Sequence, residues 1–183
     1  MTRGSSFFGD VKSRWYLVAV LSAALLVGFY VSYAWAATYS GTNGNDTLNG
    51  SNSADDIYGL DGNDDLYGHE GNDEVLGNAD IDKVYGMDGN DSELHGGPGD
   101  DRETRDGGVY GNAGQDFVYG DGGIDTLYGG PQKDVLDGGT ENDALHANDG
   151  GEDFLYGGSG INNCWYDAGT DHLAGCNGTL NPY

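Results

Sequence analysis

Aspartate is the residue most capable of chemistry in this chain, because it recurs at a fixed spacing. The spacing is nine residues from Asp46 to Asp91 and again from Asp116 to Asp143. Carboxylate oxygens without accompanying sulfur or imidazole at the same spacing are donors that suit a hard cation with flexible coordination, which points to Ca²⁺. The candidate metal-ligating aspartates are Asp46, Asp55, Asp64, Asp73, Asp82, Asp91, Asp101, Asp116, Asp125, Asp134, Asp143 and Asp153.

These aspartates occupy the sixth place of a nine-residue repeat with the pattern GxxGxDxUx, where U is a large apolar residue. The stretch from Gly59 to Leu76 shows two consecutive copies. Glycine stands at places one and four, and an aliphatic residue at place eight. The segment Arg102-Glu103-Thr104-Arg105 lacks the apolar residue, which predicts an interrupting loop. The apolar residues at place eight include Leu48, Ile57, Leu66, Val75, Val84, Leu94, Val118, Leu127, Leu136, Leu145 and Leu155.

A nine-residue unit must place its aspartate with very little secondary structure. Only the last three places suit a strand, with place eight pointing inward, while the six before it are turn formers. Two units therefore predict one coil of 18 residues with a strand on each side, and stacked coils predict two parallel sheets with aliphatic ladders between them. Aspartates two units apart, such as Asp46 and Asp64, would then form exposed ladders at the edges. Carboxylates about 5 Å apart repel by about 0.8 kcal/mol even in water, so a cation is expected between them.

The tandem GxxGxDxUx copies resemble the RTX nonapeptide, the hemolysin-type calcium-binding repeat. The resemblance implies an all-β fold, a right-handed parallel β-roll (a β-solenoid with two nonapeptide repeats per coil), with several Ca²⁺ ions held between turns. It also implies that the twelve aspartates are side-chain ligands, together with carbonyl oxygens of the glycine-rich turns. Departures from the pattern are expected to leave some sites weak or empty. They are Ser53, Asp80, Gln132 and Glu141 at place four, and Asn162 at place six.

Charge and composition exclude several other classes of protein. The 183 residues carry a formal net charge of −24, with 31 acidic residues against 7 basic ones. This balance opposes nucleic-acid binding, which needs clustered Lys and Arg. The glycine-rich stretches lack the Lys-Ser/Thr of a phosphate-binding loop, and no nucleophile–histidine arrangement stands out. We therefore expect a protein that is not an enzyme.

The N-terminal residues have the pattern of an export signal. Arg3, Lys12 and Arg14 precede an apolar run, and the small-residue triplet Ala34-Trp35-Ala36 follows. Residues 1–36 are therefore interpreted as a hydrophobic helix that serves as a signal peptide, cleaved after Ala36, or as an N-terminal membrane anchor. In either case the repeats lie outside the cytoplasm, secreted or at the cell surface. Contact with a membrane is expected only if the leader is retained.

The remaining residues, 37–183, are predicted to form the calcium-binding β-roll. Repeat blocks cover about 41–95 and 107–174, with the interrupting loop at about 101–108. Cys164 and Cys176, an even pair in an exported chain, predict a disulfide that caps the C-terminal end. Place nine is often aromatic, as at Tyr67, Tyr85 and Tyr110. Such rings either stack between coils or offer a surface for sugars or another protein. The histidines are interpreted as surface residues.

The sequence thus predicts a calcium-binding protein that folds when it binds Ca²⁺ and acts as a structural or adhesive module. Its partners beyond calcium would be a cell-surface glycan or protein, and its oligomeric state is left open. The alternative is an accessory module of an extracellular polysaccharide-acting enzyme, or a glycan-binding protein.

Overall fold

The structure, a computed structural model, describes residues 36–102, 107–147 and 150–183. Within these ranges every regular element is a β-strand, and no helix is present. The strands are β1 Thr38–Ser40, β2 Thr47–Asn49, β3 Asp56–Asp61, β4 Asp65–Glu70, β5 Glu74–Ala79, β6 Lys83–Asp88, β7 Glu93–Pro98, β8 Gly108–Ala113, β9 Phe117–Gly122, β10 Thr126–Tyr128, β11 Val135–Asp137, β12 Ala144–Ala147, β13 Phe154–Tyr156, β14 Asn163–Tyr166, β15 His172–Ala174 and β16 Leu180–Pro182.

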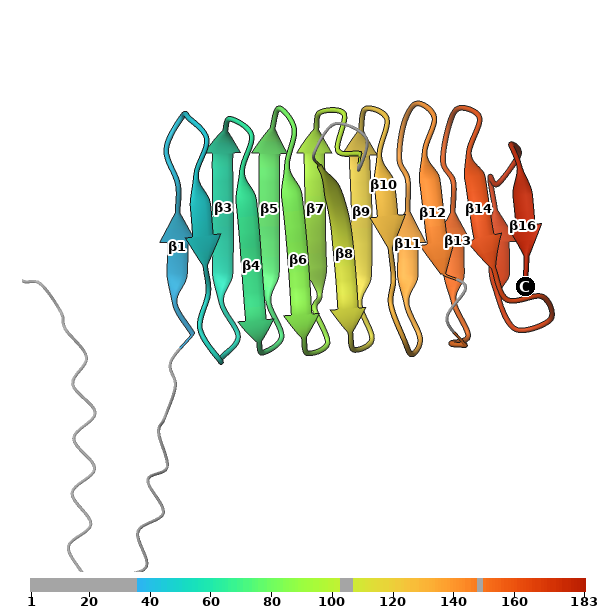
Figure 1. The fold of residues 1–183 in the computed structure, drawn as a ribbon, viewed down its shortest axis with the longest axis horizontal. Helices are drawn as coiled ribbons and strands as arrows, with labels where there is room; N and C mark the ends of the chain where they lie inside the picture. The colour runs from blue at the N-terminus through green and yellow to red at the C-terminus, as the bar shows by residue number, and fades with distance from the viewer. Residues whose placement is uncertain (1–35, 103–106, 148–149) are drawn as a thin grey trace, which may run out of the picture. The chain divides into compact units, whose positions relative to one another are not determined.

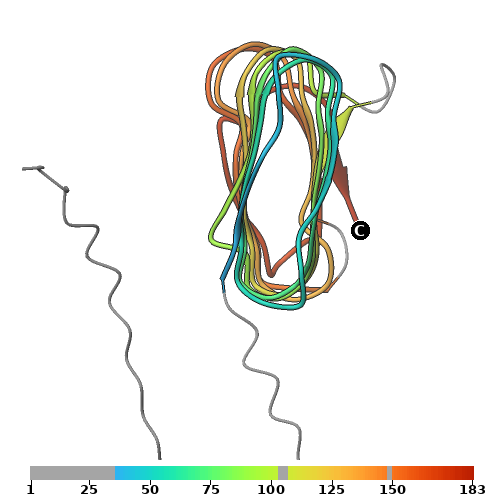
Figure 2. The ribbon, with the colours of Figure 1, turned by 90° about the vertical axis from the view of Figure 1, so that its left-hand side faces the viewer.

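The strands alternate between two parallel sheets, so the chain winds as a β-solenoid. Odd-numbered strands form one eight-stranded sheet and even-numbered strands form the other. Each strand pairs in parallel with the strand two places along the chain, which puts Ile57 beside Val75 and Leu66 beside Val84. Figure 1 shows the strands side by side along the solenoid, and Figure 2 shows the coils from one end as flattened rings. The predicted coil of two nonapeptide repeats and the parallel all-β architecture are confirmed.

The core lies between the two sheets, and each sheet contributes one line of place-eight residues to it. These side chains have no solvent exposure along almost the whole solenoid, as expected from strand alternation. At the two ends the corresponding residues, Tyr39, Leu48 and Leu173, are only partly buried. The buried core comprises Ile57, Leu66, Val75, Val84, Leu94, Val109, Val118, Leu127, Leu136, Leu145, Ala147, Leu155 and Cys164.

Strands β3 to β9 are longer than the three residues expected. Each has six residues, because the parallel ladder continues past place nine into the next repeat. Place two takes part although its backbone is left-handed, with φ 87° at Leu60 and 83° at His69. Leu60 pairs with Asn78, and His69 pairs with Met87. From β10 onward the strands shorten to three or four residues.

The predicted interruption near 101–108 does not break the solenoid. Strand β6 pairs directly with β8, and β7 pairs directly with β9, so coils on both sides of the insertion stack on one another. The two repeat blocks therefore form one continuous stack. Residues 103–106 lie outside the described residues.

Three of the four turns that lack glycine at place four still adopt the conformation that favours glycine, and Ser53 in the first coil does not. Asp80, Gln132 and Glu141 have φ values of 84°, 94° and 79°. A side chain in this region costs about 1–2 kcal/mol, so the stacked neighbours impose the turn on these residues. The solenoid geometry is therefore kept where the repeat pattern departs from glycine.

The predicted leader helix falls on residues 1–35, which lie outside the described residues. In the part of the chain that the structure describes, there is no helix of the length and apolar character needed to cross a membrane.

Candidate metal centre

The place-six aspartates line the inside of the two turn edges of the solenoid. From Asp55 to Asp153 each is at most 1% exposed, whereas Asp46 in the first coil is half-buried. The expectation of exposed carboxylate ladders is therefore wrong. Each carboxylate turns inward, because place six has the same inward orientation as the core residue at place eight.

The aspartates form two columns, one at each edge, in which successive members are about one coil apart. The first column contains Asp46, Asp64, Asp82, Asp101, Asp125 and Asp143. The second column contains Asp55, Asp73, Asp91, Asp116, Asp134 and Asp153. Residues that the sequence predicts to act together are thus brought together.

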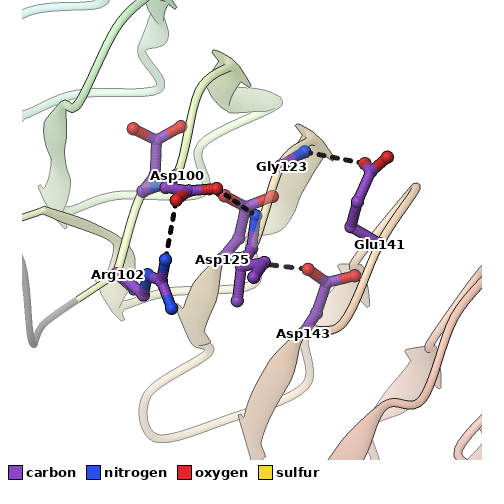
Figure 3. A network of polar contacts seen from close by, with 8 residues as sticks. Asp100, Arg102, Gly123, Asp125, Glu141 and Asp143 are labelled. Carbon is purple, nitrogen blue, oxygen red and sulfur yellow. Dashed lines mark hydrogen bonds and ion pairs between the residues drawn. The ribbon is translucent and has the colours of Figure 1, made fainter.

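From Asp55 onward, Oδ1 of each aspartate in the columns is used by the fold itself. Within a column, the backbone N–H of one aspartate donates to Oδ1 of the next, as from Asp64 to Asp82 at 2.8 Å. Figure 3 shows the same bond between Asp125 and Asp143, at 3.0 Å. The spacing grows to 25 residues between Asp91 and Asp116, across the inserted loop, yet the bond is kept at 2.9 Å. Oδ1 therefore ties each turn to the next coil.

The second carboxylate oxygen, Oδ2, is buried without a hydrogen-bond donor in the middle of both columns. Among the described residues this holds for a set of eight aspartates, and leaving a buried charged acceptor unsatisfied costs about 1–3 kcal/mol or more for each group. The sum is comparable to the whole stability of a domain, about 5–15 kcal/mol. The eight are Asp64, Asp73, Asp82, Asp91, Asp101, Asp116, Asp125 and Asp143.

Backbone carbonyl oxygens lie next to these unsatisfied atoms. A Cβ built on Gly120 would lie 2.5 Å from Asp125 Oδ2 and 2.7 Å from the carbonyl oxygen of Gly138. Gly77 gives the same result with Asp82 Oδ2 and the carbonyl of Gly96, both at 2.5 Å. Only glycine at place one leaves room for this pair of oxygens. Carboxylate and carbonyl oxygens are the ligands that Ca²⁺ takes, so the residues fit that ion.

Backbone oxygens are also needed because the carboxylates are spread along the columns. Within the described ranges, no group of three or more His, Cys, Asp or Glu side chains gathers as a metal cluster. A single ion would therefore meet one or two carboxylates and complete its shell with turn carbonyls.

Burial makes the metal-free carboxylates poor acids. Desolvation, with a contribution from neighbouring carboxylates, raises the pKa of Asp125 to about 9 and that of Asp82 to about 8. For Asp116, desolvation is the only cause that raises the pKa, and it raises it to about 6. Without a cation these groups would bind protons near neutral pH, whereas a bound cation favours their charged form.

The first coil is different, because both of its aspartates have donors for Oδ2. Thr42 donates to Asp46, and Ser51 donates to Asp55. Although burial acts to raise it, the pKa of Asp55 is lowered by hydrogen bonds from Ser51 and Ala37.

The predicted disulfide is present. Cys164, in the core line of β14, bonds to Cys176, which follows β15, with 5.9 Å between the Cα atoms. The bond closes a short loop in the last coils, next to the place-six residue Asn162.

Aromatic side chains at place nine of the even-numbered strands stack into one column. Ring centroids are 4.1–5.0 Å apart and the planes are within 15° of parallel. The sequence predicts stacked place-nine rings only in part, because two histidines interpreted simply as surface residues also stand at place nine. His146 lies in the column, and His95 stacks on Tyr119 in the other sheet. Their position in the repeat was the available signal. The stacked rings are Tyr67, Tyr85, Tyr110, Tyr128, His146 and Trp165.

Comparison with known families agrees with this geometry. The model of the RTX calcium-binding nonapeptide repeat (4 copies) matches residues 40–75, 67–102, 110–145, 128–164 and 149–173, well over half of the chain. A search of curated proteins returned no match. With its repeats, coil register and buried aspartate columns in agreement, the chain belongs to the RTX calcium-binding nonapeptide repeat family, whose repeats bind calcium ions.

Proposed function

We propose that this protein is a secreted or cell-surface structural module whose right-handed β-roll folds when Ca²⁺ binds along the aspartate columns. The observation that carries the proposal is the set of eight buried Oδ2 atoms without a donor. A compact chain in which these carboxylates are charged and unpaired would lose most of the stability of a typical domain. The candidate ligands are the twelve place-six aspartates predicted from the sequence, of which the eight in the middle of the columns have the buried Oδ2 without a donor.

The bound ion supplies positive charge where the chain has only acceptors. The chain's own residues do the rest of the work: Oδ1 fixes each carboxylate to the backbone of the adjacent coil, and glycine at place one keeps the carbonyl and Oδ2 adjacent. Binding to the folded state alone adds RT ln(1+[L]/Kd), which is about 1.4 kcal/mol for each ion when calcium is tenfold above Kd. Several ions together would make folding depend on calcium.

Location outside the cytoplasm follows from the leader pattern of residues 1–36, which would be removed or retained as an anchor. Residues 37–183 would then form the folded unit. The backbone N–H of Ala37 already takes part in it, donating to Asp55 Oδ1 at 2.7 Å. A chain that stays expanded where calcium is scarce and folds where it is abundant suits export across a membrane.

A structural role has more support than sugar binding at the aromatic rings. Sugars stack on an open ring face, but within the column each inner ring has neighbouring rings on its faces, as Tyr85 has between Tyr67 and Tyr110. Arg102, the described residue of the inserted loop that could meet an acidic partner, is paired with Asp100 at 2.6 Å. The alternative of a glycan-binding or accessory module would be supported by specific binding on a glycan array.

The test is circular dichroism and sedimentation of the purified protein with Ca²⁺, with a chelator, and with Mg²⁺ as the control ion. We expect the strand signal and the compaction to appear with Ca²⁺ and to be lost when the chelator removes it. Recovery with Mg²⁺ should be much weaker, because Mg²⁺ demands octahedral coordination. Strand content and compactness unchanged by chelation at neutral pH would overturn the proposal.

A further inference from the structure

The two ends of the aspartate columns differ from the middle in what bonds to the second oxygen of the place-six side chain. In the first coil, Asp46 Oδ2 accepts from the backbone N–H and the hydroxyl of Thr42, at 2.6 and 2.8 Å. Asp55 Oδ2 accepts the same two bonds from Ser51, at the same distances. These oxygens therefore already have donors, whereas the eight central ones have none among the described residues.

A change of backbone conformation at place two accompanies this difference. In central repeats place two is left-handed, with φ 87° at Leu60 and 82° at Met87. Thr42 and Ser51 are not among the residues with positive φ. Left-handed backbone is unfavourable for a β-branched residue such as threonine. With ordinary backbone the place-two N–H reaches Oδ2, so the backbone conformation at place two distinguishes a capped carboxylate from an open one.

At the C-terminal end of the first column an amide replaces the carboxylate. Asn162 Oδ1 accepts the backbone N–H of Asp143 at 2.8 Å, as an aspartate would. This bond fixes the amide orientation, so Nδ2 donates to the carbonyl oxygen of Gly157 and faces that of Gly175 at 3.4 Å. The carbonyl of Gly175 corresponds to the one that lies beside the carboxylate in central coils, as the carbonyl of Gly138 does beside Asp125. The amide N–H group thus stands where positive charge would otherwise be needed.

The second column ends in a similar way. Asp171, the place-six residue of the repeat that follows Asp153 in this column, accepts the backbone N–H of Asp167 on Oδ2 at 2.6 Å and that of Asp153 on Oδ1 at 3.1 Å. Asp167, like Thr42 and Ser51, is outside the positive-φ set. The disulfide between Cys164 and Cys176 adds a covalent constraint to the same coils.

We propose that calcium binds only along the middle of the two columns, and that the first and last coils are cation-free caps built from side-chain and backbone donors. The calcium-binding part would begin at Asp64 and Asp73 and end at Asp143 in the first column and before Asp171 in the second. Asp46 and Asp55, although they match the repeat pattern, would then serve as hydrogen-bonded cap residues. This inference rests on the proposed function, since it assumes that the central columns bind calcium.

The test moves the C-terminal boundary of the calcium-binding part of the first column by one place-six residue in each direction. Asn162→Asp removes the amide donor and leaves a buried carboxylate beside the carbonyls of Gly157 and Gly175, so it should bind at least one additional Ca²⁺ per chain. Asn163→Asp is the matched control: it adds the same charge one residue away, on the outward side of β14, and should leave the number unchanged. Asp143→Asn is the reverse change and should lose calcium while remaining folded. Bound calcium is counted by native mass spectrometry and by calorimetry on the full chain.

Each outcome decides between the two hypotheses. A wild-type protein that binds no calcium overturns the proposed function, and this inference with it. A wild-type protein that binds calcium, with Asn162→Asp equal to Asn163→Asp, leaves the function standing and overturns the caps. If Asn162→Asp does not fold even in excess calcium, Asp46→Asn decides: a calcium count equal to that of the wild type supports the caps, and a lower count opposes them, while Asp143→Asn should lose calcium in either case.

Discussion

Asp64 and Asp82 are joined by a hydrogen bond from the backbone N–H of the first to Oδ1 of the second, at 2.8 Å across 18 residues. Oδ2 of the same Asp82 side chain is buried without a donor among the described residues. One carboxylate therefore has two separate roles, because Oδ1 holds the coils together and Oδ2 creates the demand for a cation.

This division predicts opposite effects of two substitutions at one position. Asp82→Asn keeps the Oδ1 acceptor and supplies an amide donor to nearby carbonyls, as Asn162 does. In chelator, this variant should therefore be at least as stable as the wild type. Asp82→Ala leaves the backbone N–H of Asp64 unsatisfied and should be less stable by about 1–3 kcal/mol with calcium present. Denaturant melts in calcium and in chelator measure both. Equal loss of stability for Asn and Ala in chelator would show that the Oδ1 bond contributes little.

Acid should partly replace calcium in the chelated protein. The folded-state pKa of Asp82, Asp91 and Asp125 is raised by burial, to about 8, 7 and 9, from the usual value of 3.8. The folded metal-free chain then binds more protons than the unfolded chain between these values, so its stability is highest below about pH 4 and falls as pH rises toward 7–9. We expect strand signal in chelator to increase on acidification from pH 8 to pH 5. A metal-free strand signal that is constant or decreases over this range would contradict the assignment.

Glycine at place one should be essential where it faces the two oxygens. In Gly77→Ala the new methyl group would lie 2.5 Å from both Asp82 Oδ2 and the carbonyl of Gly96, so calcium affinity and stability in calcium should both decrease. The matched control is Gly44→Ala, where a Cβ meets no atom within 4 Å. Calcium titrations followed by circular dichroism compare the two variants. Similar midpoints for both would mean that the close approach is not required.

Left-handed turns without glycine are positions where stability is lost. Gln132 has φ 94°, so Gln132→Gly should relieve the strain and raise the melting midpoint, by about 1 kcal/mol of unfolding free energy. Glu141, with φ 79°, makes a useful comparison, because its carboxylate accepts the N–H of Gly123 at 3.1 Å (Figure 3). Glu141→Gly should therefore gain less than Gln132→Gly. The reverse order would mean that the hydrogen bond from Gly123 to Glu141 contributes little, and no gain at Gln132 would mean that the left-handed turn carries little strain.

The disulfide should matter most for the last coils. Replacing Cys164 and Cys176 by serine opens a loop with a sequence separation of 12 and should lower stability by about 3 kcal/mol, mainly through the unfolded state. Hydrogen exchange in calcium should show faster exchange in β14 to β16, with β4 to β6 unchanged. A uniform increase along the whole solenoid would indicate that unfolding is a single cooperative event.

Much of the fold could be predicted because the repeat is strictly local in its chemistry. The apolar residue at place eight, as at Leu66 and Val84, indicates which side chain enters the core, and the nine-residue period indicates the coil. The burial of Asp82 and its neighbours is not predicted in the same way, because place six is assigned to the turn, to which strand alternation, and with it the distinction between inward and outward side chains, is not applied. That distinction depends on the backbone N–H of the adjacent coil, which only the assembled stack supplies.

The end coils show a second limit of pattern reading. Asp46 matches the repeat as well as Asp64 does, yet its environment is set by Thr42, a residue at a place that the pattern leaves undefined. Likewise the role of His146 is explained only by its position at place nine, where its ring stacks between those of Tyr128 and Trp165. Places marked x in a repeat determine local differences that the fixed places cannot.

The offset of 18 residues between paired strands makes the length of this protein adjustable in steps. Deleting the segment from Gly59 to Leu76 would shorten the stack by one layer, about 4.8 Å, and join equivalent positions on both sides of the cut. Deleting only nine residues would transfer every later strand to the opposite sheet and split the row of tyrosines between two faces. Natural or engineered relatives that preserve this row should therefore differ in length by whole coils.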